Sequence, residues 1–399
     1  MRKVLKLLVS FILIVGGFFL YYSYFSGGNP PITFLQKPAV KIIKPDHLNT
    51  NLMFFGDVFW GRYINDWSMA NSLKEAYPFS GLYTLNRENY QAWIGDLDCP
   101  ITDKQVSSAE MDATLTFNCT PNYLKEAKKW FNAFNLANSH TENQGGLTGF
   151  NQTRKYLDAN GIQYFGHYDK TVTDEICEII TVKANASING TDYSLQKKTN
   201  YKLNSFNMPI AICGYHDTFA LPTQDQLDEI HKYTDKFVTL IYAIQGSEYG
   251  TTADGLQNQY FRAMIDEGAD AVIGKGAHVV QNTEVYKGKL IVYSMGNFIF
   301  DQQASPDVTK GIGVTVNLDF KYNSDVEKWQ SIVAKCTKFK DDCLAQSIKL
   351  KLNKPEFNVK YDITAIDNSG KLAKKGSNAL QTQMIQRANW DTTIKSLGQ

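Results

Sequence analysis

Residues 268–278 read Gly-Ala-Asp-Ala-Val-Ile-Gly-Lys-Gly-Ala-His, and they place a short apolar run directly before a polar cluster that ends in His278. The apolar run Ala271–Ile273 follows a helical pattern over Asp254–Glu267. Strands that alternate with helices in this way are typical of an α/β domain. Ligand sites of open α/β sheets lie outside the carboxyl ends of strands. This stretch therefore predicts the fold class, α/β, and one part of a functional site.

The same arrangement recurs along the chain. Further strands are expected at Asn51–Phe55, Ala92–Ile94, Asn132–Ala137, Val238–Ala243 and Leu290–Ser294. Helices are expected at Tyr123–Trp130 and at Leu147–Asn160, where Gly161 is a helix terminator. The polar clusters that follow strands are Gly56-Asp57, Asp96-Leu97-Asp98, Asn138-Ser139-His140, Gln245 to Glu248, and Gly296-Asn297. Turn residues follow strands in most proteins, so one cluster alone is a weak signal. Several clusters in one chain favour a shared crevice.

The N-terminal residues 1–27 indicate the compartment. Arg2, Lys3 and Lys6 precede the uncharged run Leu7–Phe25, which is long enough for one membrane-spanning helix. The basic end should stay in the cytoplasm, so we expect a single-pass cell-membrane protein whose main domain is extracytoplasmic. A cleaved signal peptide is the alternative, although Ser26-Gly27-Gly28 lacks an Ala-x-Ala-type site. Residues 28–48, where Pro recurs, are expected to form a linker.

Composition excludes some functions and leaves the cysteines open. Apolar residues make up 43% of the 399 residues, and the formal net charge is +1. The chain can therefore bury a large core, and nucleic acid is not expected as a partner. Six cysteines are compatible with disulfides in an exported chain. Cys336 and Cys343 are the closest pair and could close a local loop, whereas Cys177 and Cys213 fit buried free thiols equally well.

The motifs resemble the CapA-type poly-γ-glutamate capsule biosynthesis proteins, within the calcineurin-like metallophosphatase superfamily. The resemblance runs from about Asn51 to Asp301, and the order and spacing of its motifs make it specific. These motifs are Phe55-Gly56-Asp57-Val58, Leu136 to His140, Leu157 to Ile162, Gly246-Ser247-Glu248-Tyr249, Gly268 to Gly274, and Tyr293 to Phe298. The resemblance implies a four-layer α/β/β/α metallophosphatase-like sandwich, which we place at 49–318. It also implies a membrane-attached component of capsule polymer assembly or export.

Residues 319–399 form a C-terminal extension beyond the resemblance. Residues 321–375 carry 12 Lys against 7 Asp and Glu, with alternating runs such as Lys349-Leu-Lys351-Leu and Val359 to Ile363. We expect this segment to be β-rich. Its lysines could meet a polyanion, but a solvated lysine face is the more common outcome. Ile385–Gln399 is expected to be a short helix or a frayed tail.

Departures from the family pattern predict a degenerate metal site. Ser139, Ile244 and Gly276 stand where the family carries an Asn and two His, and in metallophosphatases those three residues serve the same metal of a pair. The resemblance leaves Asp57, Asp98 and His278 as ligands of the other metal, with Asp96 as an alternative to Asp98. These residues could hold one divalent ion (Mn, Mg, Zn or Fe), or no metal binds.

The remaining candidates are catalytic or substrate-binding residues. His140 matches the superfamily's active-site His, which would act as a general acid; otherwise it is an ordinary turn residue. Arg62 could clamp an anionic group such as a glutamate carboxylate, or form a surface salt bridge. Glu248 could orient His278 or bind a substrate amine, although an exposed loop Glu is the commoner outcome. Asn138 and Asn297 complete the substrate-binding candidates.

These observations leave three functions. The first, which we favour, is a membrane-anchored extracytoplasmic capsule component that binds or assembles polymer rather than catalysing a reaction. Its partners would be other membrane proteins of a capsule polymer synthase or export complex, and an anionic polymer such as poly-γ-glutamate. The second is a metal-dependent, phosphoesterase-like hydrolase that uses Asp57, Asp98, His140 and His278. The third is an exported interaction scaffold unrelated to polymer.

Overall fold

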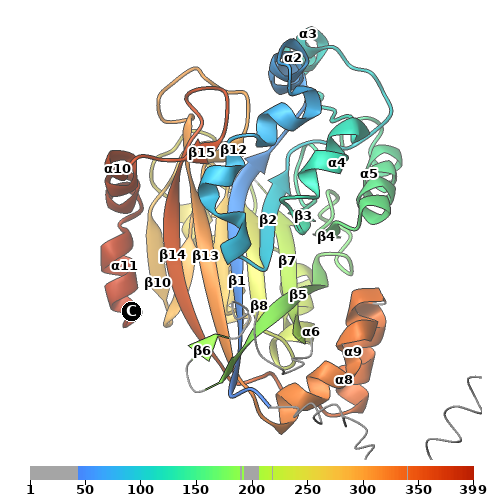
Figure 1. Cartoon of the computed structure of the whole chain (residues 1–399), viewed down its shortest axis with the longest axis vertical. Coiled ribbons are helices and arrows are strands. Elements are labelled where there is room, and N and C mark those ends of the chain that lie inside the picture. Colours follow the sequence, from blue (N-terminus) through green and yellow to red (C-terminus); the bar gives the residue numbers. More distant parts are fainter. Residues whose placement is uncertain (1–43, 189–190, 193–205, 218, 339) are drawn as a thin grey trace, which may run out of the picture. The chain divides into compact units, whose positions relative to one another are not determined.

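The computed structural model describes residues 44–399 apart from 189–190, 193–205, 218 and 339. Residues 45–195 and 205–399 belong to one compact unit, which is a mixed α/β fold rich in strands (Figure 1). This confirms the predicted α/β class. In the described part of the chain, every helix is too short or too polar to cross a membrane. The Leu7–Phe25 run predicted as an anchor lies outside the described residues.

Strand β1, His47–Val58, is the centre of the first group of strands. It pairs in parallel with β2 (Ala92–Leu97) and β12 (Asn297–Ile299), and antiparallel with β13 (Lys310–Lys321). Strand β2 continues in parallel to β3 (Ala133–Asn135), and β3 pairs with β4 (Gln163–Phe165). Because β1, β2, β3 and β12 run in the same direction, their carboxyl ends share one edge of the sheet.

The second group of strands is joined to the first through β5, Cys177–Ile188, which pairs with both β1 and β7. Parallel pairing then runs in order from β7 (Phe206–His216) through β8 (Thr239–Ile244) and β9 (Ala271–Lys275) to β11 (Lys289–Val292). Strand β10, Thr283–Tyr286, closes this side as an antiparallel neighbour of β11. The two-residue strand β6, Thr191–Asp192, pairs with β5.

Helices cover the outer faces of the two groups of strands. Tyr260, Phe261 and Trp329 belong to a buried cluster between the second group and helices α6 (Gln224–Thr234), α7 (Gly255–Asp266) and α8 (Ser324–Lys338). A second cluster, with Trp60, Trp93 and Phe131, lies outside the first group. It is covered by α2 (Arg62–Ala70), α3 (Ser108–Thr114), α4 (Leu124–Ala127), α5 (Leu147–Asn160), and short 3-10 helices at Lys74–Phe79, Leu82–Leu85, Arg87–Asn89 and Pro121–Tyr123.

The inner faces of the two groups of strands touch each other. The hydroxyl of Tyr242 on β8 donates to the backbone oxygen of Phe55 on β1 at 2.7 Å. The Tyr242 ring also lies 6.4 Å from the ring of Phe54. On β7, a Cβ at Gly214 would approach Oδ1 of Asn135 on β3 to 2.2 Å, so only glycine permits this contact. The strand ends of both groups are thereby held beside one another.

The predicted central elements are largely confirmed. Helix α5 spans the predicted Leu147–Asn160, and Gly161 follows it in the left-handed conformation with φ of 70°. Helix α7 begins after Asp254, whose side chain accepts from the backbone N of Gln257. The helix predicted at Tyr123–Trp130 is wrong in length, because only Leu124–Ala127 is α-helical.

The prediction of a β-rich C-terminal extension is wrong for most of its length. Besides α8 it contains α9 (Lys340–Lys349) and α10 (Asn378–Ala388), whereas α11 (Trp390–Ser396) agrees with the short helix expected within Ile385–Gln399. The Lys349-to-Leu352 alternation is not a strand; it spans the end of α9. Helix α8 buries Val326, Trp329 and Cys336, a spacing that places one apolar face against β5 and β7. The predicted strand at Val359–Ile363 is confirmed within β14, Phe357–Asp367, and β15 (Lys374–Lys375) pairs with it.

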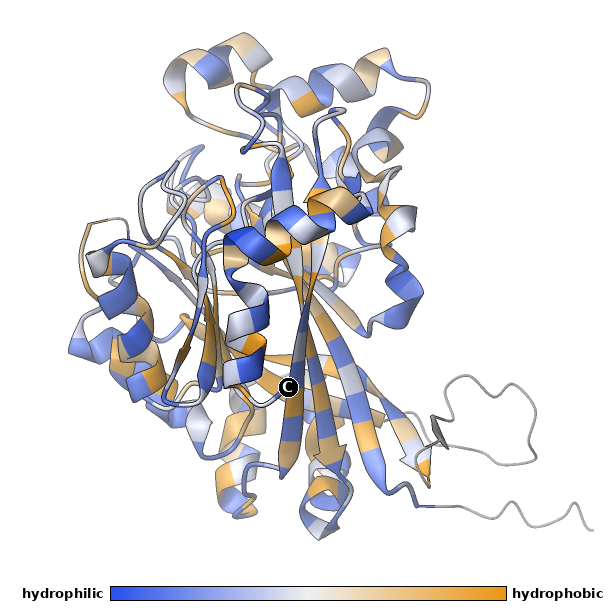
Figure 2. Cartoon of the chain, turned by 90° about the vertical axis from the view of Figure 1, so that its left-hand side faces the viewer, coloured by the Kyte–Doolittle hydropathy of each residue, from blue (hydrophilic) through white to orange (hydrophobic). Residues whose placement is uncertain are grey.

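Strand β14 continues the first group of strands beside β13, and its outer edge is covered by glutamine side chains. Hydrophobic and hydrophilic residues alternate along the long strands (Figure 2). The amide of Gln381 bonds the backbone N of Ala365 and the backbone O of Ile363. Gln399 bonds the backbone N of Tyr361 and the backbone O of Val359 in the same manner. These bonds cover the strand edge that would otherwise pair with another chain.

All six cysteines form disulfides: Cys99–Cys119, Cys177–Cys213 and Cys336–Cys343. The predicted local pair Cys336–Cys343 is confirmed, and it joins α8 to α9. The free-thiol interpretation of Cys177 and Cys213 is wrong, because these residues face each other across the antiparallel pair β5–β7. Such a pairing depends on strand register, which no local pattern reveals.

Removing the disulfide Cys99–Cys119 should destabilise the protein by about 3 kcal/mol, since it closes a loop with a sequence separation of 20. The double variant Cys99→Ala/Cys119→Ala tests this in urea denaturation of the purified protein. The matched control, Cys336→Ala/Cys343→Ala, opens a much shorter loop and should cost about 2 kcal/mol. A larger loss in the control than in the Cys99/Cys119 variant would contradict this account.

Candidate functional site

A cavity of about 210 Å³ lies at the carboxyl ends of the strands, and most of the predicted polar clusters contribute to it. Asp57 is the penultimate residue of β1 and follows Gly56, where a Cβ would approach the backbone oxygen of Gly296 to 1.7 Å. A glycine is therefore required for β1 to lie this close to the residues before β12. Predicted residues that line the cavity are Arg62, Asp98, Asn138, Ser139, His140, Ile244, Glu248, Gly276 and His278.

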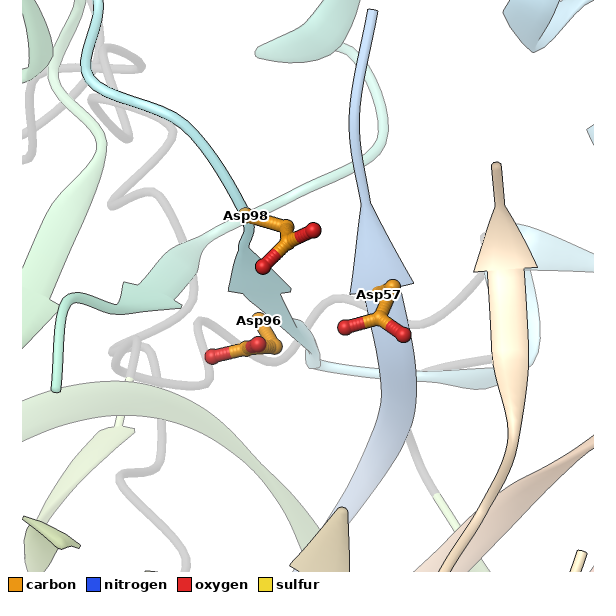
Figure 3. Close-up of side chains that lie close together, drawn as sticks. All are labelled: Asp57, Asp96 and Asp98. Atoms are coloured by element: carbon orange, nitrogen blue, oxygen red, sulfur yellow. The ribbon is translucent and has the colours of Figure 1, made fainter. Parts of the chain in front are cut away.

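Three buried carboxylates cluster beside the cavity, and one of them, Asp98, lines it. Asp57, Asp96 and Asp98 offer oxygen atoms that lie within 4.8 Å of one another (Figure 3). Asp57 comes from β1, whereas Asp96 and Asp98 come from the end of β2, so the parallel pairing of these strands brings the carboxylates together. Each side chain is at most 2% exposed. Both Asp98 and its predicted alternative Asp96 therefore belong to the site.

Asn138 and Asn135 hold two of these carboxylates in place. The Nδ2 group of Asn138 donates to Asp96 Oδ2 at 2.6 Å and to Asp98 Oδ1 at 2.7 Å. Asn135 Nδ2 donates to Asp96 Oδ1 at 2.7 Å. Asn138, predicted to bind substrate, therefore uses its amide to bridge two side chains of the protein. The unbridged oxygen of Asp98, Oδ2, is buried and has no hydrogen-bond partner among the described residues.

A lysine that the sequence analysis did not single out lies among the carboxylates. The ammonium of Lys275, the last residue of β9, is 2.5 Å from Asp57 Oδ1 and 4.0 Å from Asp96 Oδ2. Lys275 is only 5% exposed. The sequence does contain a signal for this residue, because Lys275 directly continues an apolar run that is expected to be a buried strand. A lysine in such a place requires an anionic partner. Its partner Asp57 is 218 positions earlier in the chain and could not be identified from the local pattern.

The Lys275–Asp57 pair keeps both groups charged. Burial by itself raises the pKa of Asp57, but the Lys275 ammonium and the His278 imidazole outweigh it and hold that pKa below its usual value. Burial by itself lowers the pKa of Lys275, but Asp57, Asp98 and Asp96 outweigh it and raise that pKa above its usual value. The result is a buried ion pair in which each partner stabilises the charge of the other.

The other two carboxyls respond in the opposite direction. Burial raises the pKa of Asp96 well above its usual value, with Lys275 opposing the rise and Asp57 and Asp98 adding to it. Burial also raises the pKa of Asp98, against the effects of His140 and Lys275. Three carboxyls face one ammonium, so burial and the repulsion among the carboxylates disfavour ionisation of Asp96 and Asp98.

The residues present do not fit a divalent ion shared by these carboxylates. The carboxylates are close enough to hold one ion, but the Lys275 ammonium already contacts Asp57 and lies toward Asp96. An ion at that point would face a like charge at contact distance in a buried, weakly screened position. The other half of the cavity is lined by Ser139, Ile244 and Gly276. A metal-ligating side chain does not fit at Gly276 without a shift of the backbone. A Cβ there would approach the backbone oxygen of Gln245 to 1.9 Å.

His278 uses its Nδ1 atom within the protein. Nδ1 lies 3.0 Å from Asp57 Oδ2 and 2.8 Å from Asn297 Oδ1, and both of these atoms are acceptors. We therefore assign the proton to Nδ1, which leaves Nε2 for the cavity. Burial by itself lowers the pKa of His278, but its bond to Asp57 outweighs burial and raises that pKa above its usual value. Asn297, predicted to bind substrate, contacts this histidine.

His140 stacks on an aromatic ring at the cavity wall. Its ring lies 4.0 Å from the ring of Phe117, and its Nδ1 is 3.1 Å from the side-chain oxygen Oδ1 of Asn143. Because that oxygen accepts, Nδ1 carries the proton and Nε2 remains for a ligand. The backbone N of His140 donates to Asn138 Oδ1 at 2.7 Å, which fixes the turn after β3.

Arg62 is paired within the protein, and Glu248 is the exposed loop residue that was the commoner expectation. The guanidinium of Arg62 forms a two-pronged ion pair with Asp301, with bonds of 2.7 and 2.5 Å. Arg62 is 7% and Asp301 is 5% exposed, so the pair is buried and the surface salt-bridge interpretation is wrong. Glu248 has an exposed side chain. Its backbone oxygen, not its carboxylate, accepts from the backbone N of His278 at 2.7 Å.

Comparisons with known proteins relate the chain to bacterial capsule synthesis proteins. The family described as "Bacterial capsule synthesis protein PGA_cap" matches residues 51–302. The chain is 28% identical over 290 residues to the "PGA biosynthesis protein CapA" of Bacillus subtilis (strain 168), which covers 67% of each chain. It is 25% identical over 269 residues to the "Capsule biosynthesis protein CapA" of Bacillus anthracis, covering 62% of this chain and 59% of that relative. An uncharacterised Sinorhizobium fredii protein, y4sH, is 31% identical over 99 residues, which is 23% of this chain and 21% of that protein.

The raised pKa of His278 predicts a pH dependence of stability. A histidine whose pKa is higher in the folded state stabilises the fold fully below its unfolded pKa of about 6.5, and this contribution is lost as the pH rises through the folded pKa. The stability advantage of the wild type over His278→Gln should therefore be larger at pH 6 than at pH 9. Urea denaturation at both pH values measures it. An advantage that grows with pH would refute the assignment.

Proposed function

Because the chain belongs to the bacterial capsule synthesis protein family, which matches residues 51–302, we propose that it acts in the biosynthesis or export of a capsule polymer. The names of two relatives, "PGA biosynthesis protein CapA" and "Capsule biosynthesis protein CapA", support this role. The family resemblance further supports a polymer of the poly-γ-glutamate type. The strands and the helices on their outer faces are compatible with the metallophosphatase-like sandwich that the family implies.

The protein acts at the outer side of the cell membrane. The uncharged Leu7–Phe25 run after a basic N-terminus supports a single-pass anchor with an extracytoplasmic main domain. The disulfides Cys99–Cys119, Cys177–Cys213 and Cys336–Cys343 support an oxidising compartment independently of that run. Its partners are other membrane proteins of a polymer synthase or export complex.

The cavity binds a ligand rather than hydrolysing one, and the observation that carries this proposal is the buried pair Lys275–Asp57. Hydrolysis by the family's metal chemistry needs a divalent ion to polarise the reacting oxygen, and this pair stands where the ion would be. The cavity still offers recognition groups. Asp98 Oδ2 accepts from a donor group of the ligand, and the exposed Ser139 hydroxyl lines the same cavity. An amide-bonded polymer that carries carboxylates presents both donors and acceptors to such a cavity.

The alternatives are distinguished by what His140 does. In the hydrolase alternative, His140 is a general acid beside Asp98, and its loss would lower the rate by roughly 10² to 10⁴. The position of His140 on the cavity wall is the observation that favours this alternative. In the scaffold alternative, the cavity has no role, so blocking it would leave the function of the protein unchanged.

Capsule production should survive His140→Ala and fail with Ser139→Trp, because a bulky side chain at the exposed Ser139 fills the cavity without disturbing the core. Capsule polymer per cell is measured together with protein level in the native bacterium. His231→Ala, which changes an exposed histidine on α6, is the matched control. Loss of capsule in the His140→Ala strain at normal protein level would establish the hydrolase instead. Normal capsule in both strains would favour the scaffold.

We expect a reporter enzyme that is fused after Gln399 to be found on the outer side of the membrane. A reporter that is active only after export should therefore be active in this fusion. The expectation follows from the basic residues before the Leu7–Phe25 run. If the fused reporter were active in the cytoplasm, the proposed orientation of the protein in the membrane would be wrong. Sequencing the N-terminus of the mature protein separates the two export routes, since a start near Gly28 means cleavage and a start near Met1 means an uncleaved anchor.

A further inference from the structure

The carboxylate cluster of this chain contains its own cation. The family's chemistry calls for an external metal ion near Asp57, yet the Lys275 ammonium lies 2.5 Å from Asp57 Oδ1 and 4.0 Å from Asp96 Oδ2. Lys275 is the last residue of β9 and pairs with Ile244 on the neighbouring strand β8. The strand therefore fixes where the lysine stem begins, and the carboxylates fix where the ammonium ends.

The pattern of replaced residues around Lys275 is consistent with the loss of metal binding at both positions. Ser139, Ile244 and Gly276 line the half of the cavity where the second metal of a pair would be held. His278, which would serve the first metal, directs Nδ1 to Asp57 and Asn297 instead. Asn138 donates both of its amide bonds to Asp96 and Asp98. Most of the carboxylate oxygens thus contact side chains of the protein, and Asp98 Oδ2 is the exception among the described residues.

We propose that Lys275 permanently replaces the divalent metal ion, so that this site works without metal and a metal site is created only when Lys275 is removed. The physical basis is charge balance in a dry environment. Buried carboxylates this close together need a positive partner, and either an ammonium or a divalent ion can supply it. The two cations exclude each other because they would occupy the same space with the same sign of charge.

The decisive variant is Lys275→Ala, which removes the ammonium and leaves space between the carboxylates. Purified full-length wild type and variant are titrated with MnCl2 alone, and the melting temperature and the bound manganese per chain are measured. The wild type should show no change in melting temperature with MnCl2 or EDTA. The variant should melt at a lower temperature without metal, bind about one ion per chain, and regain about 5 °C when Mn²⁺ is saturating.

Lys354→Ala is the matched control. Lys354 contacts another buried carboxylate, Asp270, at 2.5 Å, and Asp270 retains a second lysine, Lys289, at 3.0 Å. This variant also loses a lysine from a buried carboxylate, but away from the cavity, so its melting temperature should not respond to Mn²⁺. A response equal to that of Lys275→Ala would mean that Mn²⁺ acts on the surface in general, and would overturn the proposal.

Two further outcomes decide the case if Lys275→Ala does not fold. The double variant Lys275→Met/Asp57→Asn removes both charges of the pair and should fold without responding to Mn²⁺. The wild type provides the other measurement, because stoichiometric binding of Mn²⁺ that raises its melting temperature would overturn the proposal. These results are independent of capsule production, so failure of the capsule role and failure of the cation replacement are distinguishable.

Discussion

The buried ion pair between Lys275 and Asp57 is the interaction on which the organisation of the site depends. Two strands from different groups, β9 and β1, end at this pair, and each charge offsets much of the cost of burying the other. Removing the ammonium alone would leave an uncompensated carboxylate at a cost of about 3–5 kcal/mol. The stability of the two strand ends therefore depends on Lys275 and Asp57 both remaining charged beside the cavity.

Close backbone contacts provide the geometry that the pair requires. Gly56 allows β1 to approach Gly296, and Gly214 allows β7 to approach Asn135. The bond from Tyr242 to the backbone of Phe55 ties β8 to β1 between these points. These contacts explain why carboxylates from β1 and β2 meet an ammonium from β9 within a few ångströms. A side chain at either glycine would push the strands apart and separate the charges.

The sequence predicted those parts of the fold and the site that local patterns encode. Apolar runs followed by polar turns located β1, β8 and β9, and the terminator Gly161 located the end of α5. The shared direction of parallel strands favoured one crevice for the polar clusters, and the family resemblance singled out Asp57, Asp98 and His278 within it. Helix α8 was missed because two short alternating runs outweighed the helical spacing of Val326, Trp329 and Cys336.

Long-range partners could not be predicted in the same way. The pairing of Cys177 with Cys213 depends on the register of β5 and β7, and that of Arg62 with Asp301 depends on how helix α2 meets the turn after β12. The role of Lys275 was missed for this reason, since a lysine in an apolar strand indicates that a partner exists but not which residue it is. Each case joins segments that are far apart in the chain.

Anomalous X-ray diffraction at the manganese edge, from wild-type crystals soaked in MnCl2, tests the central claim most directly. The account predicts the Lys275 ammonium within hydrogen-bond distance of Asp57 and no anomalous peak between Asp57, Asp96 and Asp98. An anomalous peak among these carboxylates, with the Lys275 side chain turned away from Asp57, would contradict it.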